Sequence, residues 1–265
     1  MNSMCPQLFG LSPVIRGRKP RTSGLTSIID RGIPVSELRG LMENAGEYID
    51  LCKFGWCTWL LMPERLVKSK IEVCEEFDVK VLPGGSSIEA AFIRGKAEEF
   101  LRFVKELGFT SIEISSGIAN ISIEEKLRLV RLAKDLDFCP VITEVGRKDP
   151  KEDLALPLNE RIRLMKLELE AGADYVVVEA RESGKGIGPY NAKGDVKESF
   201  VEAIVRDVPV EKIIWEAPLK SQQVWLIKRF GPNVNLGNVQ VGDVIPLETL
   251  RLGLRGDTML KFLLS

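Results

Sequence analysis

Three short apolar runs in the second half of the chain each end on a glutamate. These residues are Glu144, Glu179 and Glu216. Apolar runs without polar alternation are typical of strands that are buried on both faces, as in a parallel sheet. Because parallel strands end at the same edge of a sheet, we expect the three carboxylates to lie close together. Carboxylate oxygens suit Mg²⁺, so the pattern predicts a metal or acid/base site.

An alternative interpretation is structural. Any one of these glutamates could belong to a buried ion pair or to a layer of side chains that closes a barrel. Three glutamates in register favour the metal site. The chain contains no histidine, so a metal bound by histidine is excluded and proton transfer falls to Lys, Glu, Asp, Tyr or Cys.

Basic side chains gather at or just after the ends of these and other apolar runs of the chain. They are Lys53, Arg147, Lys148, Arg181, Lys185 and Lys220. The protein as a whole is nearly neutral, with 37 basic and 38 acidic residues. The concentration of cations in these loops therefore predicts a small, strongly anionic ligand. Because side chains alternate along a strand, Glu179 and Arg181 are expected to lie side by side.

One of these loops is rich in glycine. Gly184, Gly186 and Gly188 flank Lys185 and Ile187. Backbone N–H groups of such a segment can cradle a phosphate, because glycine permits the required conformations. An ordinary flexible loop is the alternative.

Eight apolar runs alternate with amphipathic segments, as expected for repeated βα units. The runs are Leu25–Asp30, Ile49–Phe54, Val79–Leu82, Ser111–Ile114, Val141–Glu144, Tyr175–Glu179, Ile213–Glu216 and Val234–Leu236. Eight such units predict a (β/α)8 TIM barrel. We expect residues 1–22 to form a partly irregular arm and residues 23–265 a single barrel domain.

Several helix starts between these runs can be predicted. Ser122 with Glu125 forms a capping-box pattern, Asn159 precedes a helix that stops near Gly172, and Pro63 begins another helix. Asn235, in the last run, adds a polar group that we expect near the ligand.

Composition limits the class of protein. The balanced charge disfavours nucleic acid as a partner, and no stretch approaches the 18 uninterrupted apolar residues of a membrane span. The five cysteines form an odd set without a CxxC pair, which favours a reducing compartment. We therefore expect a cytoplasmic protein without an export signal.

Taken in order, the loop motifs resemble those of the phosphosulfolactate synthase family. The matching segments include Lys53-Phe54-Gly55-Trp56, Pro83-Gly84-Gly85, Thr143-Glu144-Val145-Gly146, Arg181 to Gly188, Glu216-Ala217-Pro218, Lys220 to Gln223 and Asn235-Leu236. The resemblance covers residues 24 to about 258. It implies addition of sulfite to phosphoenolpyruvate, a barrel fold, dependence on Mg²⁺ and a homo-oligomer.

The resemblance also implies roles for individual residues. Lys148 corresponds to the lysine that serves as the acid, and we expect its pKa to be depressed by cationic neighbours and partial burial. Glu144, Lys53 and Arg181 complete the expected catalytic set. The glycine loop with Arg147, Lys185, Lys220 and Asn235 is expected to bind substrate or phosphate.

Ser116 and Asn120 depart from the family pattern, because acidic residues are usual at both positions. This loss could change the affinity for metal or the preference for substrate. Two other functions stay open. The plant heat-stress-associated branch of the same family is not a synthase, and another barrel lyase acting on a phosphorylated acid would use the same cations and carboxylates.

Overall fold

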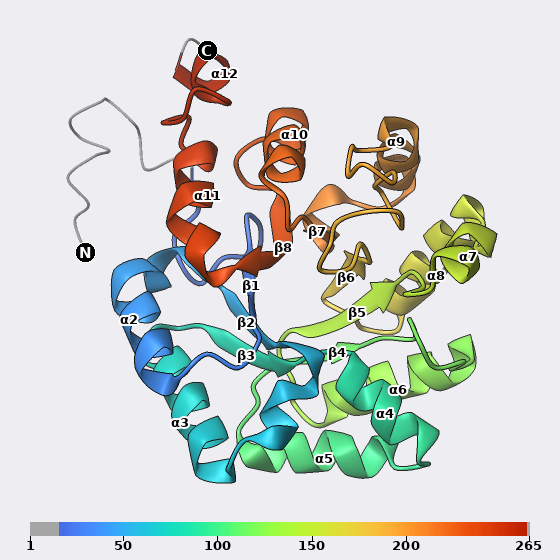
Figure 1. The fold of residues 1–265 in the computed structure, drawn as a ribbon. Helices are drawn as coiled ribbons and strands as arrows, with labels where there is room; N and C mark the ends of the chain where they lie inside the picture. The colour runs from blue at the N-terminus through green and yellow to red at the C-terminus, as the bar shows by residue number, and fades with distance from the viewer. Residues whose placement is uncertain (1–15, 264–265) are drawn as a thin grey trace.

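Eight parallel strands follow one another around a barrel in the computed structural model, which describes residues 16–263 (Figure 1). The strands are β1 (Thr26–Asp30), β2 (Leu51–Phe54), β3 (Lys80–Pro83), β4 (Ile112–Ile114), β5 (Val141–Val145), β6 (Tyr175–Val178), β7 (Ile213–Glu216) and β8 (Asn235–Gln240). The hydrogen-bonded order is β3-β2-β1-β8-β7-β6-β5-β4. The predicted (β/α)8 TIM barrel is confirmed, and its ring of strand pairs stays open between β3 and β4.

Helices follow the strands and cover the outside of the barrel (Figure 1). They are α2 (Val35–Ala45), α3 (Glu64–Glu75), α4 (Ser86–Ile93), α5 (Ala97–Leu107), α6 (Ile123–Asp135), α7 (Pro150–Ala155), α8 (Leu158–Glu170), α9 (Glu198–Asp207), α10 (Lys220–Phe230), α11 (Val244–Arg251) and α12 (Met259–Leu263). Short 3-10 turns lie at η2 (Gly46–Tyr48), η3 (Gly55–Leu61), η4 (Val210–Lys212) and η5 (Val241–Asp243). None of the helices between residues 16 and 263 is long and apolar enough to cross a membrane.

The predicted helix starts agree with the structure to within two residues. Ser122 caps α6 by accepting a hydrogen bond from the Glu125 N–H at 3.2 Å. The helix expected after Asn159 begins earlier, at Leu158, because Pro157 occupies its N-cap. Pro63 is the N-cap of α3 rather than its first residue.

The core has two apolar layers. The larger layer lies between strands and helices, and a smaller cluster consists of Leu25, Leu51, Leu82, Ile142, Tyr175, Val177 and Ile214. Four members of the smaller cluster precede a charged residue by two positions. They are Leu51 before Lys53, Ile142 before Glu144, Val177 before Glu179 and Ile214 before Glu216. Residues two apart on a strand share a face, so an apolar floor lies beneath a charged layer inside the barrel.

Residues 16–22 pack at the opposite end of the barrel from the glutamates, without a helix or strand. Arg16 pairs with Glu248 at 2.9 Å, and Arg21 pairs with Asp50, just before β2, at 2.9 Å. Lys19 donates to backbone carbonyls of Gly46 and Phe77. These contacts attach the described part of the predicted arm to the barrel, whereas residues 1–15 lie outside the described range.

Candidate active site

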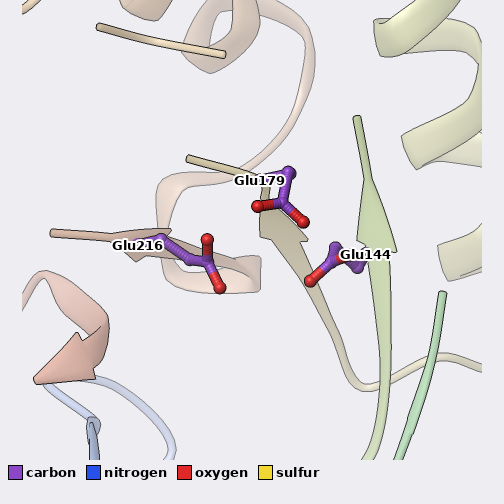
Figure 2. Close-up of side chains that lie close together, drawn as sticks. All are labelled: Glu144, Glu179 and Glu216. Carbon is purple, nitrogen blue, oxygen red and sulfur yellow. The ribbon is translucent and has the colours of Figure 1, made fainter. Parts of the chain in front are cut away.

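Glu144, Glu179 and Glu216 meet at the carboxyl ends of β5, β6 and β7. Figure 2 shows their carboxylates turned toward one another. One carboxylate oxygen of each lies within 4.8 Å of those of the other two, and each residue is at most 2% exposed. The sequence-based expectation that these side chains come together is confirmed.

Two lysines contact this cluster. The ammonium nitrogen of Lys148 lies 2.5 Å from a carboxylate oxygen of Glu179 and 3.2 Å from one of Glu144. The Lys53 ammonium lies 3.2 Å from Glu216 and 3.2 Å from Glu113 of β4. Four carboxylates thus surround two cations, and full ionisation of the six groups leaves two net negative charges.

Backbone N–H groups fix the carboxylates that face the lysines. Glu216 accepts a hydrogen bond from the Ala180 N–H at 2.9 Å, and Glu179 accepts one from the Arg181 N–H at 2.6 Å. Glu113 accepts from the Gly85 N–H at 2.9 Å. Such bonds orient oxygens that would otherwise be buried without partners.

Burial and neighbouring charges shift the pKa values of Glu144 and Glu179 in opposite directions. Burial, followed by the charges of Glu144 and Glu216, raises the pKa of Glu179 well above its usual range, against the opposing effect of Lys148. Burial also acts to raise the pKa of Glu144. Lys148, a hydrogen bond with Glu179 and the charge of Lys53 together outweigh it and lower that pKa to about 2. A proton is therefore held more readily by Glu179 than by Glu144.

The expected depression of the Lys148 pKa is wrong for this arrangement. Burial does act to lower it, but the charges of Glu144, Glu179 and Glu216 raise the pKa of Lys148 well above its ordinary value. The prediction assumed cationic neighbours. The groups in contact with the ammonium are carboxylates.

The glutamate cluster is chemically suited to a divalent cation. Its donors are all oxygens, they lie close enough to share one ion, and the surrounding charges leave a net −2 when ionised. Mg²⁺ prefers carboxylate oxygens and keeps coordination positions for water or substrate. Glu144, Glu179 and Glu216 therefore fit Mg²⁺.

The cluster faces a cavity of about 90 Å³ at the carboxyl ends of the strands. We call it the central cavity, and its lining residues are Ile29, Lys53, Gly55, Trp56, Gly84, Gly85, Ser86, Glu113, Glu144, Lys148, Glu179, Arg181, Glu182, Glu216 and Asn238. A second cavity, of about 140 Å³, lies elsewhere and includes Ser116, Lys126, Arg147 and Glu168. The central cavity contains the converging charges and is the candidate active site.

Arg181 lines this cavity, but not because of the alternation of side chains along a strand that we expected. Strand β6 ends at Val178, and Arg181 has a positive φ of 61°, so strand alternation does not set its direction. Its side chain is 40% exposed and lies 3.9 Å from Glu182. Arg181 and Glu179 nevertheless line the same cavity.

The glycine loop is held by hydrogen bonds within the chain. The N–H groups of Gly184, Gly186 and Gly188 donate to Arg181 O, Asn191 O and an Asp153 carboxylate oxygen at 3.3, 2.9 and 2.8 Å. These three N–H groups therefore donate to acceptors of the protein itself and do not form the phosphate cradle that the sequence suggested.

The other predicted binding residues lie outside the lining of the central cavity. Lys185 is exposed, Lys220 pairs with Asp257 at 3.0 Å, and Arg147 donates to the carbonyl oxygens of Ser116 and Ala119. The predicted position of Asn235 is wrong. Its amide donates to the carbonyls of Glu211 and Ile213 near the amino end of β7, away from the glutamates.

A family model for (2R)-phospho-3-sulfolactate synthase (ComA) matches residues 15–257, which is most of the chain. The chain belongs to this family.

Relatives agree with the assignment to the phosphosulfolactate synthase family. Phosphosulfolactate synthase of Methanocaldococcus jannaschii is 46% identical over 235 residues, covering 89% of this chain and 93% of that protein. Protein HEAT-STRESS-ASSOCIATED 32 of Arabidopsis thaliana is 28% identical over 267 residues, covering 89% of this chain and 88% of the plant protein.

Solved structures support the barrel. The structure of 3-hexulose-6-phosphate synthase from Salmonella typhimurium has a TM-score of 0.56 at 15% identity and covers 86% of this chain and 99% of that one. At this identity the likeness shows the fold alone.

The two departures from the phosphosulfolactate synthase pattern lie away from the glutamate cluster. Ser116 is half-buried beside the second cavity, and Asn120 is exposed. Neither residue lines the central cavity.

Among the lining residues of the central cavity that sequence reasoning did not single out, two are buried and polar, Glu113 and Asn238. Glu113 was a polar residue near a strand end, but nothing in the sequence distinguished it as the partner of Lys53. Asn238 is 4% exposed, and its buried side-chain oxygen has no hydrogen-bond partner in the part of the chain described. It could have been found by extending the eighth strand beyond Leu236, because β8 continues to Gln240.

Proposed function

We propose that the central cavity catalyses the addition of sulfite to phosphoenolpyruvate, giving 2-phospho-3-sulfolactate, with Mg²⁺ as cofactor. Membership of the phosphosulfolactate synthase family supports the reaction. The observation that carries the proposal is the contact of the Lys148 ammonium with Glu144 and Glu179 inside a cavity lined by five glutamates. This arrangement combines a proton donor with oxygen ligands for a cation.

Glu144, Glu179 and Glu216 would hold the magnesium ion. When bound, Mg²⁺ supplies positive charge that stabilises negative charge on a substrate oxygen. It would also offset the net negative charge of the cluster, which alone would repel a multiply charged anion. Lys53 and Arg181, which line the same cavity, add positive charge for the carboxylate, phosphate or sulfite groups.

The electron pair of sulfite sulfur forms a bond to the methylene carbon of phosphoenolpyruvate. The electrons of the carbon–carbon double bond move toward the carboxylate and give an enediolate, while the phosphate ester stays intact. An N–H of Lys148 then donates a proton to the carbon that bears the phosphate, and solvent restores the proton to the lysine. One sulfite, one phosphoenolpyruvate and one proton give one product.

The test follows the enol phosphate absorbance of phosphoenolpyruvate with and without sulfite and Mg²⁺. We expect loss of absorbance only when sulfite and Mg²⁺ are both present, and loss of activity on chelation that added Mg²⁺ restores. Lys148→Arg keeps the positive charge between the glutamates but donates protons poorly, so turnover should fall about 10²-fold or more. Lys166→Ala removes an exposed lysine of α8 that pairs with Asp207, and should leave turnover unchanged.

The same assay separates the alternatives. Full turnover in folded Lys148→Arg would remove this lysine from the proposed proton transfer. Consumption of a different phosphorylated acid in a substrate screen, without a requirement for sulfite, would indicate another barrel lyase. A folded protein that is inert toward all substrates would favour the non-synthase function of the heat-stress-associated branch.

Two further predictions concern the protein in its cell. We propose that the chain forms a homo-oligomer, which size-exclusion chromatography with light scattering would measure. We also propose a cytoplasmic location, supported by the cysteine pattern, and Cys52, Cys57, Cys74 and Cys139 are free thiols among the described residues. Fractionation of cells would test the location.

A further inference from the structure

Glu89 is a buried carboxylate outside the central cavity whose hydrogen bonds all point to one loop. It lies on α4 and is 1% exposed. Its oxygens accept hydrogen bonds from the Ser115 hydroxyl and from the N–H groups of Gly117, Ile118 and Ala119, the last three at 3.1, 2.7 and 2.5 Å. We call residues 115–119 the β4 loop, since they follow β4 directly.

Three consecutive N–H groups converge on this one anion. Such a concave arrangement of backbone donors binds a negative charge tightly, and here the charge is supplied by the chain itself. Without the carboxylate, buried donors of the β4 loop would lack acceptors, so the loop could not keep this conformation without cost. Glu89 therefore determines the shape of the β4 loop.

The β4 loop in turn holds the segment that carries the proposed acid. The Lys148 N–H donates to the carbonyl oxygen of Gly117 at 2.9 Å. Arg147 donates to the carbonyl oxygens of Ser116 and Ala119 at 2.5 and 3.2 Å. The loop thus binds the backbone of Lys148 and the side chain of the residue before it.

Gly117 also packs directly against the Lys148 side chain. A Cβ atom at this position would lie 3.1 Å from Cγ of Lys148 and 3.4 Å from a carboxylate oxygen of Glu144. The aliphatic part of the lysine therefore runs along a wall formed by the glycine backbone. A shift of that wall changes the direction of the ammonium between Glu144 and Glu179.

We propose that Glu89 is a positioning residue for Lys148, acting through the β4 loop. This inference rests on the proposed function only in the role it gives to Lys148. Within residues 16–263, the hydrogen bonds of Glu89 go to the β4 loop and not to Lys148 or the three glutamates of the cluster. Its contribution is to the geometry of proton donation rather than to the binding of Mg²⁺.

The test compares Glu89→Gln with the wild type by kcat, KM for phosphoenolpyruvate, affinity for Mg²⁺ and thermal unfolding. Glutamine places an NH₂ group against backbone donors, so the loop must rearrange. Since small misplacements of catalytic groups cost about 10²-fold, we expect kcat to fall about that much while KM and Mg²⁺ affinity change less than about threefold.

Two matched variants distinguish displacement of Lys148 from a general loss of stability. Glu248→Gln removes a carboxylate that is also buried but pairs with Arg16 at the other end of the barrel, and should lower stability while kcat stays unchanged. Gly117→Ala keeps the Glu89 carboxylate and the N–H groups that bind it but adds a Cβ atom against the Lys148 side chain. It should reproduce the selective fall in kcat even where Glu89→Gln folds poorly.

Hydrogen–deuterium exchange supplies a readout that does not depend on synthase activity. Glu89→Gln should speed exchange in both 115–121 and 146–149, and Glu248→Gln in neither. A wild type that does not add sulfite, together with this exchange pattern, would reject the proposed function and keep the positioning role. Unchanged exchange at 146–149, or a kcat within twofold of wild type in folded Glu89→Gln and Gly117→Ala, would overturn the proposal.

Discussion

The two lysines of the central cavity have different surroundings. Lys53 is 7% exposed and lies between Glu113 and Glu216, which with Glu144 raise its pKa despite its burial. The Lys148 side chain is 28% exposed and approaches the cavity from a loop. Lys53 is thus a fixed counter-ion within the barrel, whereas Lys148 has the access that a proton donor needs.

Asn238 provides a test at the level of one side chain. Its buried oxygen has no partner among the described residues, so the fold gains no hydrogen bond from it. Its φ of 53° suits glycine equally well. We therefore expect Asn238→Gly to leave the free energy of unfolding within about 1 kcal/mol of wild type but to lower kcat/KM for phosphoenolpyruvate about 10-fold.

Urea unfolding and steady-state kinetics would measure the two effects of this substitution. Unchanged kcat/KM in the glycine variant would show that the Asn238 side chain does not bind the substrate. A loss of stability of several kcal/mol would instead indicate a structural role.

At the level of elements, the turn after β5 determines where Glu179 lies. Gly146 has a φ of 147°, and a Cβ atom there would lie 2.6 Å from Cβ of Glu179. Gly95, between α4 and α5, also has a positive φ, of 70°, but a Cβ atom there would have no neighbour within 4 Å. Substitution of the two glycines therefore separates the effect of backbone strain from the effect of displacing Glu179, a proposed ligand of Mg²⁺.

We expect Gly95→Ala to cost about 1 kcal/mol of stability, from strain alone, and to keep full activity. Gly146→Ala should cost more than this and should also weaken Mg²⁺ binding about 10-fold or more, because it moves Glu179. Calorimetric titration with Mg²⁺ and chemical denaturation would distinguish the pair. Equal Mg²⁺ affinity in both variants would contradict the role given to Gly146.

The elements were more predictable than the details of the site. Apolar runs located the strands because burial on both faces leaves a clear signal, and the three glutamates were placed correctly because each closes such a run. Asn235 was misplaced because Gly237 and Asn238 resemble a turn, although β8 continues through them to Gln240. The pKa of Lys148 was mispredicted because sequence order does not show which charges are in contact.

On the scale of the whole molecule, the candidate active site and the segment 16–22 lie at opposite ends of the barrel. Tyr175, in the apolar floor, donates its hydroxyl to the carbonyl oxygen of Thr22 at 3.0 Å. Burial, then the charges of Asp174 and Asp50, raise the pKa of this phenol above its ordinary value of 10.0. In barrels of this type, residues at the amino end of the strands serve stability rather than catalysis.

This raised pKa makes the stability depend on alkaline pH. Above pH 10 the unfolded chain loses a phenolic proton that the folded protein keeps. The contribution of Tyr175 to the free energy of unfolding is therefore fully present below pH 10 and is lost as the pH rises through the folded pKa. Tyr175→Phe removes this effect and one hydrogen bond, worth about 1 kcal/mol. Its deficit in the free energy of unfolding should be constant from pH 7 to 9 and shrink above pH 10 in urea titrations. A constant deficit through pH 11 would contradict the prediction.

The gap between β3 and β4 has a consequence for how the barrel responds to its ligand. No strand ladder joins these two described strands, although the N–H groups of Thr110 and Ser111, just before β4, donate to the Val81 carbonyl oxygen of β3. Nearer the mouth, Glu113 receives the Gly85 N–H after β3 and the ammonium of Lys53 from β2. An anion that competes for Lys53 would weaken this side-chain bridge. We therefore expect ligand binding to loosen one of the two carboxylate connections across this side of the mouth, while Glu89 of α4 keeps its hydrogen bonds to the β4 loop.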